Sequence, residues 1–148
     1  MLKSNLKRIF FLSLFALMGC QTHPYIISES YLPVSDHRRA IVAAIGEPRT
    51  VSQNGREITS FYHDRNFKYV DESKKPKIRY FTKVVVLGPR RPYEVSVEVI
   101  KEQRDPDTKQ YIEQGLDDSL SQIRVNEIAN VLNQSREKPQ SVDVENPF

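Results

Sequence analysis

The chain has 148 residues, about the length of one domain, and its 39% hydrophobic and 28% charged residues exclude an intrinsically disordered protein. Its formal net charge of +3 would suit a nucleic-acid-binding protein, but the excess cations, Lys3, Lys7 and Arg8, lie at the start of the chain. The rest of the sequence has 19 basic and 19 acidic side chains, so we expect no nucleic-acid partner.

The first 19 residues have the layout of an export signal. Three cations precede an apolar run at residues 9–18, and the small residue Gly19 follows it. A membrane-spanning helix needs roughly 20 apolar residues to cross about 30 Å of hydrocarbon. The run is too short for that, and residues 1–19 are therefore predicted to be a signal peptide.

The next residue, Cys20, is the only cysteine of the chain. The sequence that leads to it, Leu17-Met18-Gly19-Cys20, resembles the lipobox of bacterial lipoproteins. The resemblance implies cleavage between Gly19 and Cys20, attachment of lipid to the Cys20 thiol and acylation of the new amino terminus. Several acyl chains together anchor a protein stably, whereas one chain binds a membrane only marginally. The alternative is a buried free cysteine in a cytosolic domain, which leaves the apolar segment unexplained.

Gln21 follows the cysteine of the lipobox. In lipoproteins of Gram-negative bacteria Asp at this place marks retention in the inner membrane, so the resemblance implies the outer membrane here. Residues 20–34 are predicted to be the lipidated cysteine and a tether, because they contain two prolines and no clear period. The tether has more apolar side chains than a solvated linker needs, and we expect part of it to pack on the domain as an edge strand.

The predicted domain covers residues 35–135 and begins with a short helix. Asp36 is expected to be its N-cap, because a carboxylate there accepts hydrogen bonds from free amides of the first turn. Gly46 and Pro48 predict its end. The residues at helical spacing that form its apolar stripe are Ala40, Ile41, Ala44 and Ile45.

Two β-hairpins are predicted next. The turn Asn54-Gly55 joins residues 49–53 to residues 56–63. Alternating residues at 77–87 and 93–102 flank a turn and form the second hairpin. The register that its faces predict places Val84 opposite Val97, Val86 opposite Val95, Lys83 opposite Glu98 and Arg79 opposite Glu102.

After a polar loop at residues 103–110 the sequence predicts a long helix capped by Asp117 or Asp118. Residues 136–148 are predicted to be a flexible tail. The stripe expected to face the core consists of Leu120, Ile123, Ile128, Val131 and Leu132, with Arg124 and Asn130 toward solvent. The predicted fold class is therefore α+β: a small antiparallel sheet of about four strands, with one face covered by the short N-terminal helix and the longer C-terminal helix.

Residues 38–62, RRAIVAAIGEPRTVSQNGREITSFY, are similar to the core of the BamE (SmpA/OmlA) lipoproteins. In that family a helix ends at a glycine-proline turn and a hairpin carries an aromatic strand. The matching positions here are Ile45-Gly46-Glu47-Pro48 and Phe61-Tyr62. The resemblance implies a role in envelope assembly. The chain departs from the family because it lacks a second preceding helix and a Trp in the hairpin, and because its C-terminal helix is long.

The sequence contains no recognisable motif for catalysis, cofactor binding or metal binding. Its three histidines are scattered, without the spacing of a metal site. Ser60, His63 and Asp64 are the residue types of a catalytic triad, but neighbours in sequence rarely reach triad geometry, and a nucleophile elbow is missing. The aspartates at positions 105, 107, 117 and 118 lack the calcium-loop pattern of an EF-hand. We therefore expect neither an enzyme nor a bound cofactor.

The charges are unevenly distributed along the chain. Residues 37–91 carry 13 basic and 5 acidic side chains, whereas residues 92–148 carry 6 basic and 12 acidic ones. One interpretation is that opposite charges pair across the sheet and stabilise it. The other is a surface of cations and aromatic rings for an anionic partner. The residues of this candidate surface are Arg65, Phe67, Lys68, Tyr69, Lys74, Lys75 and Lys77.

Together these features predict an outer-membrane lipoprotein with a periplasm-facing domain that binds or scaffolds other envelope components. Its partners would be the membrane, through the lipid anchor, and an anionic component: lipopolysaccharide phosphate, a teichoic or phospholipid head group, or an acidic protein face. One alternative is a lipoprotein that binds glycans or small molecules, which would need a deep apolar pocket. The other is a periplasmic enzyme that depends on His63.

Overall fold

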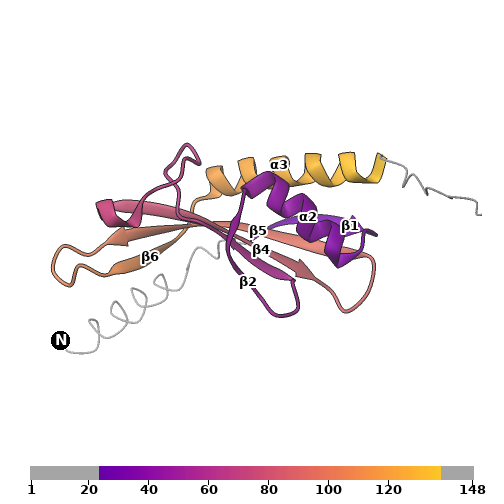
Figure 1. The fold of residues 1–148 in the computed structure, drawn as a ribbon, viewed down its shortest axis with the longest axis horizontal. Coiled ribbons are helices and arrows are strands. Elements are labelled where there is room, and N and C mark those ends of the chain that lie inside the picture. Colours follow the sequence, from indigo (N-terminus) through magenta and orange to yellow (C-terminus); the bar gives the residue numbers. More distant parts are fainter. Residues whose placement is uncertain (1–23, 138–148) are drawn as a thin grey trace, which may run out of the picture.

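The computed structural model describes residues 24–137, and within them it has six strands in one antiparallel sheet and two α-helices (Figure 1). The elements are β1 (Tyr25–Ser30), α2 (Val34–Ile45), β2 (Pro48–Val51), β3 (Glu57–Ser60), the 3₁₀ turn η2 (Glu72–Lys74), β4 (Ile78–Leu87), β5 (Tyr93–Arg104), β6 (Tyr111–Leu116) and α3 (Asp118–Glu137). The strand order is β1-β5-β4-β3-β2, and β6 also pairs with β5. The predicted α+β class is confirmed, with a sheet somewhat larger than the expected four strands.

The long hairpin of β4 and β5 forms the centre of the sheet. The pairs in its register are the predicted ones: Val84 with Val97, Val86 with Val95, Lys83 with Glu98 and Arg79 with Glu102. The four valines are buried on the face that meets the helices. A slip of one residue would turn these valines to the other face, so burial fixes the register. The predicted hairpin around Gly55 is also present, with β2 paired to β3.

The two strands beyond the predicted number both pair with the edge of β5 that faces away from β4. β1 comes from the predicted tether and pairs with the first half of β5, Tyr25 opposite Val97. The expected edge strand is therefore confirmed, and the sheet begins before the predicted boundary at residue 35. β6 pairs with the second half of β5. The sequence analysis missed β6 because its residues, YIEQGL, do not alternate between buried and exposed.

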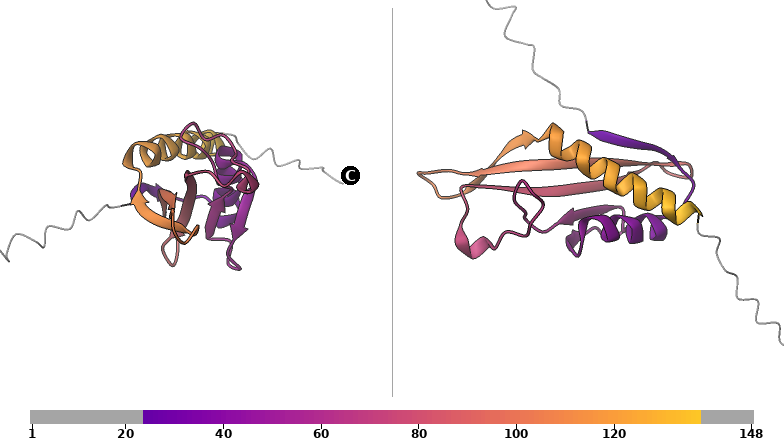
Figure 2. Two further views of the ribbon diagram at one scale, coloured as in Figure 1. Left: turned by 90° about the vertical axis from the view of Figure 1, so that its left-hand side faces the viewer. Right: turned by 90° about the horizontal axis from the view of Figure 1, so that it is seen from above.

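Both helices cover the same face of the sheet, as predicted (Figure 1). Seen from above, α3 lies between α2 and β1 (Figure 2). The core under the helices includes Ile41 of α2, Ile58 of β3, and Ile128 and Leu132 of α3. The end of the sheet that carries β6 extends beyond both helices (Figure 1). The loop between β3 and β4 lies at this end of the sheet (Figure 1).

The start of α2 differs from the prediction. The helix begins at Val34, directly after Pro33, so that Asp36 lies in its first turn and does not cap it. His37 is buried there instead, and its Nδ1–H donates to the Pro33 carbonyl at 2.9 Å. The end of α2 is the predicted one: Gly46 follows with a φ of +81°, and its amide donates to the Val42 carbonyl.

α3 is capped by Asp117, one of the two predicted residues, because its Oδ1 accepts from the Leu120 amide at 3.1 Å. Two adjacent residues of α3 lie on the sides opposite to those predicted: Ile123, predicted to face the core, is 46% exposed, and Arg124, predicted to face solvent, is only 7% exposed. Arg124 lies four residues from both Leu120 and Ile128, and therefore on the buried line of the helix. α3 continues to Glu137, so residues 136 and 137, predicted to belong to the flexible tail, are helical; the rest of the predicted tail, residues 138–148, lies outside the described residues.

Candidate functional site

The segment at residues 64–77, here called the basic loop, carries the predicted basic surface. Its two ends are joined by backbone hydrogen bonds that extend the β3–β4 pairing: His63 and Tyr80 exchange two of 2.9 Å. Within the loop the Val70 amide donates to the Tyr62 carbonyl at 2.9 Å, and the Asp64 amide donates to the Lys68 carbonyl at 2.9 Å. The loop is therefore held by its backbone and presents its side chains from fixed positions.

The three carboxylates of the basic loop are all engaged by neighbouring donors. The Asn66 and Lys68 amides donate to Asp64 Oδ1, at 2.8 and 3.0 Å. The Ser73 amide donates to Asp71 Oδ1 at 2.9 Å, and this bond lowers the pKa of Asp71. Glu72 forms an ion pair of 3.2 Å with Arg79 of β4. These carboxylates therefore stabilise the turns of the loop and the start of β4.

Unlike the carboxylates, the cations of the basic loop are not engaged in ion pairs within the part of the chain that the structure describes. The side chains of all five are exposed, and none forms an ion pair with a carboxylate of residues 24–136; they are Arg65, Lys68, Lys74, Lys75 and Lys77. Cross-strand pairing accounts for other charges of the sheet, such as Arg79 with Glu102 at 2.6 Å. It does not account for the cations of the loop.

The two aromatic residues of the basic loop lie differently. Phe67 is half-buried, with the Arg124 guanidinium carbon 3.8 Å from its ring centroid and the His63 ring at 5.0 Å. It packs against the small core of Tyr80, Val99 and Leu120 and so fastens the loop to the sheet and to α3. Tyr69 is 68% exposed, and its ring packs edge to face with that of Phe61, which is itself 41% exposed, at 6.0 Å between the ring centroids.

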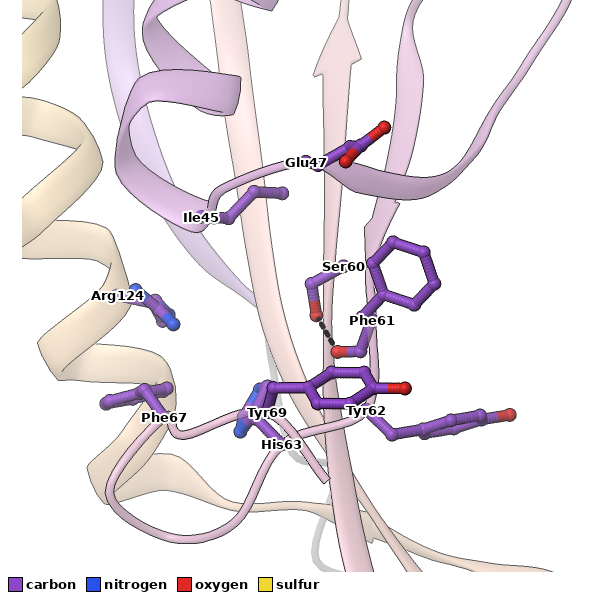
Figure 3. Close-up of a pocket in the computed structure, with 9 residues that line it drawn as sticks. All are labelled: Ile45, Glu47, Ser60, Phe61, Tyr62, His63, Phe67, Tyr69 and Arg124. Atoms are coloured by element: carbon purple, nitrogen blue, oxygen red, sulfur yellow. Dashed lines mark hydrogen bonds between the residues drawn. The ribbon is translucent and has the colours of Figure 1, made fainter. Parts of the chain in front are cut away.

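A cavity of about 370 Å³, here called the hollow, opens beside these rings (Figure 3). It lies where the end of α2, the end of β3, the basic loop and α3 meet. Its lining residues are Ile45, Glu47, Ser60, Phe61, Tyr62, His63, Phe67, Tyr69 and Arg124. The hollow is open to solvent and has charged as well as aromatic walls, so it is not the deep apolar pocket expected of a small-molecule carrier.

Arg124 joins three of the elements around the hollow. Its Nη1 donates to the Ala44 carbonyl at 3.2 Å and to Glu127 at 2.6 Å, and its guanidinium lies over the ring of Phe67. Its Nε is buried and has no hydrogen-bond partner in the part of the chain that the structure describes. The sequence analysis missed this residue. The signal was its helical spacing, since the long apolar stem of an arginine can follow a buried line while its head finds partners.

His63, Ser60 and Asp64 do not form a catalytic triad. The Nδ1–H of His63 donates to the Asp64 carbonyl at 2.8 Å, and its Nε2 accepts from the Thr82 hydroxyl at 3.2 Å. Burial lowers the pKa of His63 despite that carbonyl bond, so the ring is neutral at neutral pH. The Ser60 hydroxyl donates to the Phe61 carbonyl at 2.8 Å. His63 therefore supplies a fixed ring to the hollow and has no free nitrogen for a substrate.

The remaining candidate residues either stabilise turns of the fold or lie outside the described residues. Within residues 24–137 no group of three or more His, Cys, Asp and Glu side chains could hold a metal ion. Asp105 accepts from the Thr108 and Asp107 amides and closes the β5–β6 turn. The lipidation and sorting residues Gly19, Cys20 and Gln21 lie outside the described residues. Neither helix of the described part of the chain is long and apolar enough to cross a membrane.

Comparison of the chain with models of protein families, with curated proteins and with solved structures finds no match. The resemblance of residues 38–62 to the BamE lipoproteins therefore stays a prediction. Any function has to be argued from the residues and from the geometry of the basic loop and the hollow.

Proposed function

We propose that the protein is a lipid-anchored lipoprotein of the outer membrane that faces the periplasm and binds an anionic component of the cell envelope through the basic loop. One observation carries the binding part of the proposal. The carboxylates of the loop are engaged by its own amides and by Arg79, while its five cations are exposed and form no ion pair with a carboxylate of residues 24–136. Such a cluster attracts anions, and its effect is screened by salt.

The order of the strands supports a partner other than the anchoring lipid. Four residues separate Cys20 from Tyr25, the first residue of β1. A link of that length spans about 18 Å or less even when extended. A lipid on Cys20 would therefore keep the β1 edge of the sheet near the bilayer. The basic loop joins β3 to β4, on the other side of β5 from β1, where it could meet a component away from the membrane.

The anchor is tested by mass spectrometry of the mature protein from bacterial membranes. We expect a chain that begins at Cys20 and carries acyl groups on it, and we expect Cys20→Ser to leave an unprocessed and unlipidated precursor. A mature chain that begins elsewhere, or a Cys20 without acyl mass, would remove the lipoprotein part of the proposal.

The binding surface is tested by charge reversal in the full-length protein, reconstituted in nanodiscs of neutral lipid. The probes are a polyglutamate peptide and vesicles that contain phosphatidylglycerol. Arg65→Glu combined with Lys68→Glu should weaken binding by about tenfold or more at low salt and flatten its salt dependence. The matched control is Arg90→Glu combined with Arg91→Glu, the same change of charge on exposed residues of the β4–β5 turn. Equal losses in the two variants would mean that net charge, and not the basic loop, binds the probes.

A further inference from the structure

We infer that the anionic partner is an acidic protein segment and that the hollow receives one of its apolar side chains. This inference rests on the proposed function, because it uses the basic loop as an anion-binding surface, and it narrows the partner from any polyanion to a peptide. The hollow, its exposed rings and its position beside the cations carry the argument.

Two large aromatic side chains at the rim of the hollow, Phe61 and Tyr69, are exposed to solvent. Tyr69 and Phe61 pack edge to face, and both line the hollow (Figure 3). Aromatic residues and arginine are the side chains that most often anchor protein interfaces. At about 370 Å³ the hollow is near the lower limit of ligand pockets, roughly 300 Å³, so it suits a single large side chain better than a cofactor.

The walls of the hollow are held in position by contacts within the protein. Arg124 ties α3 to the carbonyl of Ala44 at the end of α2. His63 is fixed at both ring nitrogens. Phe67 is held between Arg124 and the small core of Tyr80, Val99 and Leu120. A preformed cavity costs little ordering entropy on binding, which favours a defined anchor residue over loose electrostatic association.

Residues 65–69 of the basic loop carry both cations and aromatic rings. Phe67 and Tyr69 line the hollow, and the exposed cations Arg65 and Lys68 lie between and before them in the loop. A peptide that places an apolar side chain in the hollow would bring its flanking residues next to these cations, and acidic residues are favoured there. Glu47 at the rim can accept a hydrogen bond from a peptide amide.

The test uses full-length protein in nanodiscs of neutral lipid and two labelled probes. One is a short peptide of Asp and Glu with a central Phe, and the other is the same peptide with Ala at the centre. Fluorescence anisotropy should show that the Phe peptide binds about tenfold more tightly than the Ala peptide. Tyr69→Ala should remove most of this difference, because the two peptides differ only in the side chain that would enter the hollow.

The matched control for this variant is Tyr31→Ala. Tyr31 is 66% exposed, close to the value for Tyr69, but lies between β1 and α2, away from the basic loop. It should change the binding of neither peptide. Thermal melts of both variants show that the fold is retained, since neither removes a buried side chain.

The other outcomes separate this inference from the proposed function. If both peptides bind equally and both are weakened by Arg65→Glu with Lys68→Glu, the loop binds anions without the hollow, and only the inference is overturned. If vesicles with phosphatidylglycerol bind and the peptides do not, the partner is a lipid, and again only the inference is overturned. If neither peptides nor vesicles bind, the inference and the binding part of the proposed function are both overturned.

Discussion

Val84 of β4 lies directly opposite Val97 of β5, and both side chains are completely buried under the helices. Val97→Asp should therefore unfold the domain, because a buried and unpaired carboxylate costs several kcal/mol against a total stability of roughly 5–15 kcal/mol. Glu98, the next residue, points to the opposite face, beside Lys83. Glu98→Ala should cost about 0–1 kcal/mol. Urea melts compare the two variants, and a larger loss for Glu98→Ala would mean that the two faces of β5 are assigned the wrong way round.

Arg79 is held by two rings and two carboxylates on the face of the sheet opposite the helices. Its guanidinium carbon lies 3.5 Å from the ring centroid of Tyr62 and 3.6 Å from that of Tyr111, and its Nε donates to Glu102 at 2.6 Å. Arg79→Ala should cost about 3–5 kcal/mol, because it leaves the half-buried Glu102 without its partner. Arg79→Lys should recover only part of this, since an ammonium group cannot stack between two rings as a planar guanidinium does.

The control for Arg79 is Glu72→Ala. Glu72 is exposed, and its ion pair with Arg79 should contribute no more than about 1 kcal/mol. Chemical denaturation of the three variants gives the ranking. Lysine at position 79 with full wild-type stability would show that the charge alone, and not the stacking, holds this corner of the sheet.

The central hairpin could be predicted from the sequence because its alternation is strict and because a slip would bury charge. β6 could not, because it is short and none of its residues is buried, so that pairing with β5 decides its position. Arg124 was assigned to solvent because a pattern of residue types scores arginine as polar. Arg124 is buried by tertiary contacts: it packs on the ring of Phe67 in the basic loop and donates to the carbonyl of Ala44, 80 residues earlier in the chain.

The candidate site was predictable only in part. The exposure of the cations and of Tyr69 follows from a polar loop of that composition. Loop amides donate hydrogen bonds to Asp64 and Asp71 because of the geometry of the turns, and the sequence predicts this geometry only weakly. The hollow is assembled from four elements that are distant in sequence, and no local pattern indicates a cavity of this kind.

Gly46 ends α2 with φ +81° and ψ −166°, a combination that only glycine adopts without strain. A Cβ added there would meet no atom within 4 Å, so the cost of Gly46→Ala would come from the backbone alone. We expect a loss of about 1–3 kcal/mol in urea melts. Ala43→Gly, on the exposed side of the same helix, is the control and should cost about 0.5–1 kcal/mol. An unchanged stability of Gly46→Ala would show that the turn has another conformation.

Gln21→Asp tests the sorting of the proposed lipoprotein. In a Gram-negative host that follows the usual sorting signal, this single change should move the protein from the outer to the inner membrane. Density-gradient fractionation of the two membranes measures the distribution, with Gln21→Ser as the matched control that should stay in the outer membrane. A distribution that Gln21→Asp leaves unchanged would remove the argument for the outer membrane, while leaving the anchor itself untouched.

Two buried histidines should make the stability of the domain depend on pH. Burial lowers the pKa of both His37 and His63 below the usual value of 6.5, so both are neutral in the folded protein. The unfolded chain binds protons at these positions as the pH falls through about 6.5, and the folded chain does not until lower pH. Stability is therefore full above about pH 6.5 and declines below it. The lowered pKa of Asp71, Asp105 and Asp117 acts in a separate window, because their usual value is 3.8.

Urea melts at about pH 7.5 and about pH 5.5 measure the contribution of the histidines, and each should account for a loss of up to about 1.4 kcal/mol over this interval. His63→Gln retains a donor for the Asp64 carbonyl and an acceptor for Thr82, and should reduce the pH dependence without removing the contribution of His37. His37→Gln should likewise reduce the pH dependence of stability and leave the contribution of His63. Stability that stays constant between the two pH values, or that rises as the pH falls, would mean that the histidines are charged or accessible in the folded state, contrary to the burial of His37 in α2 and of His63 beside the basic loop.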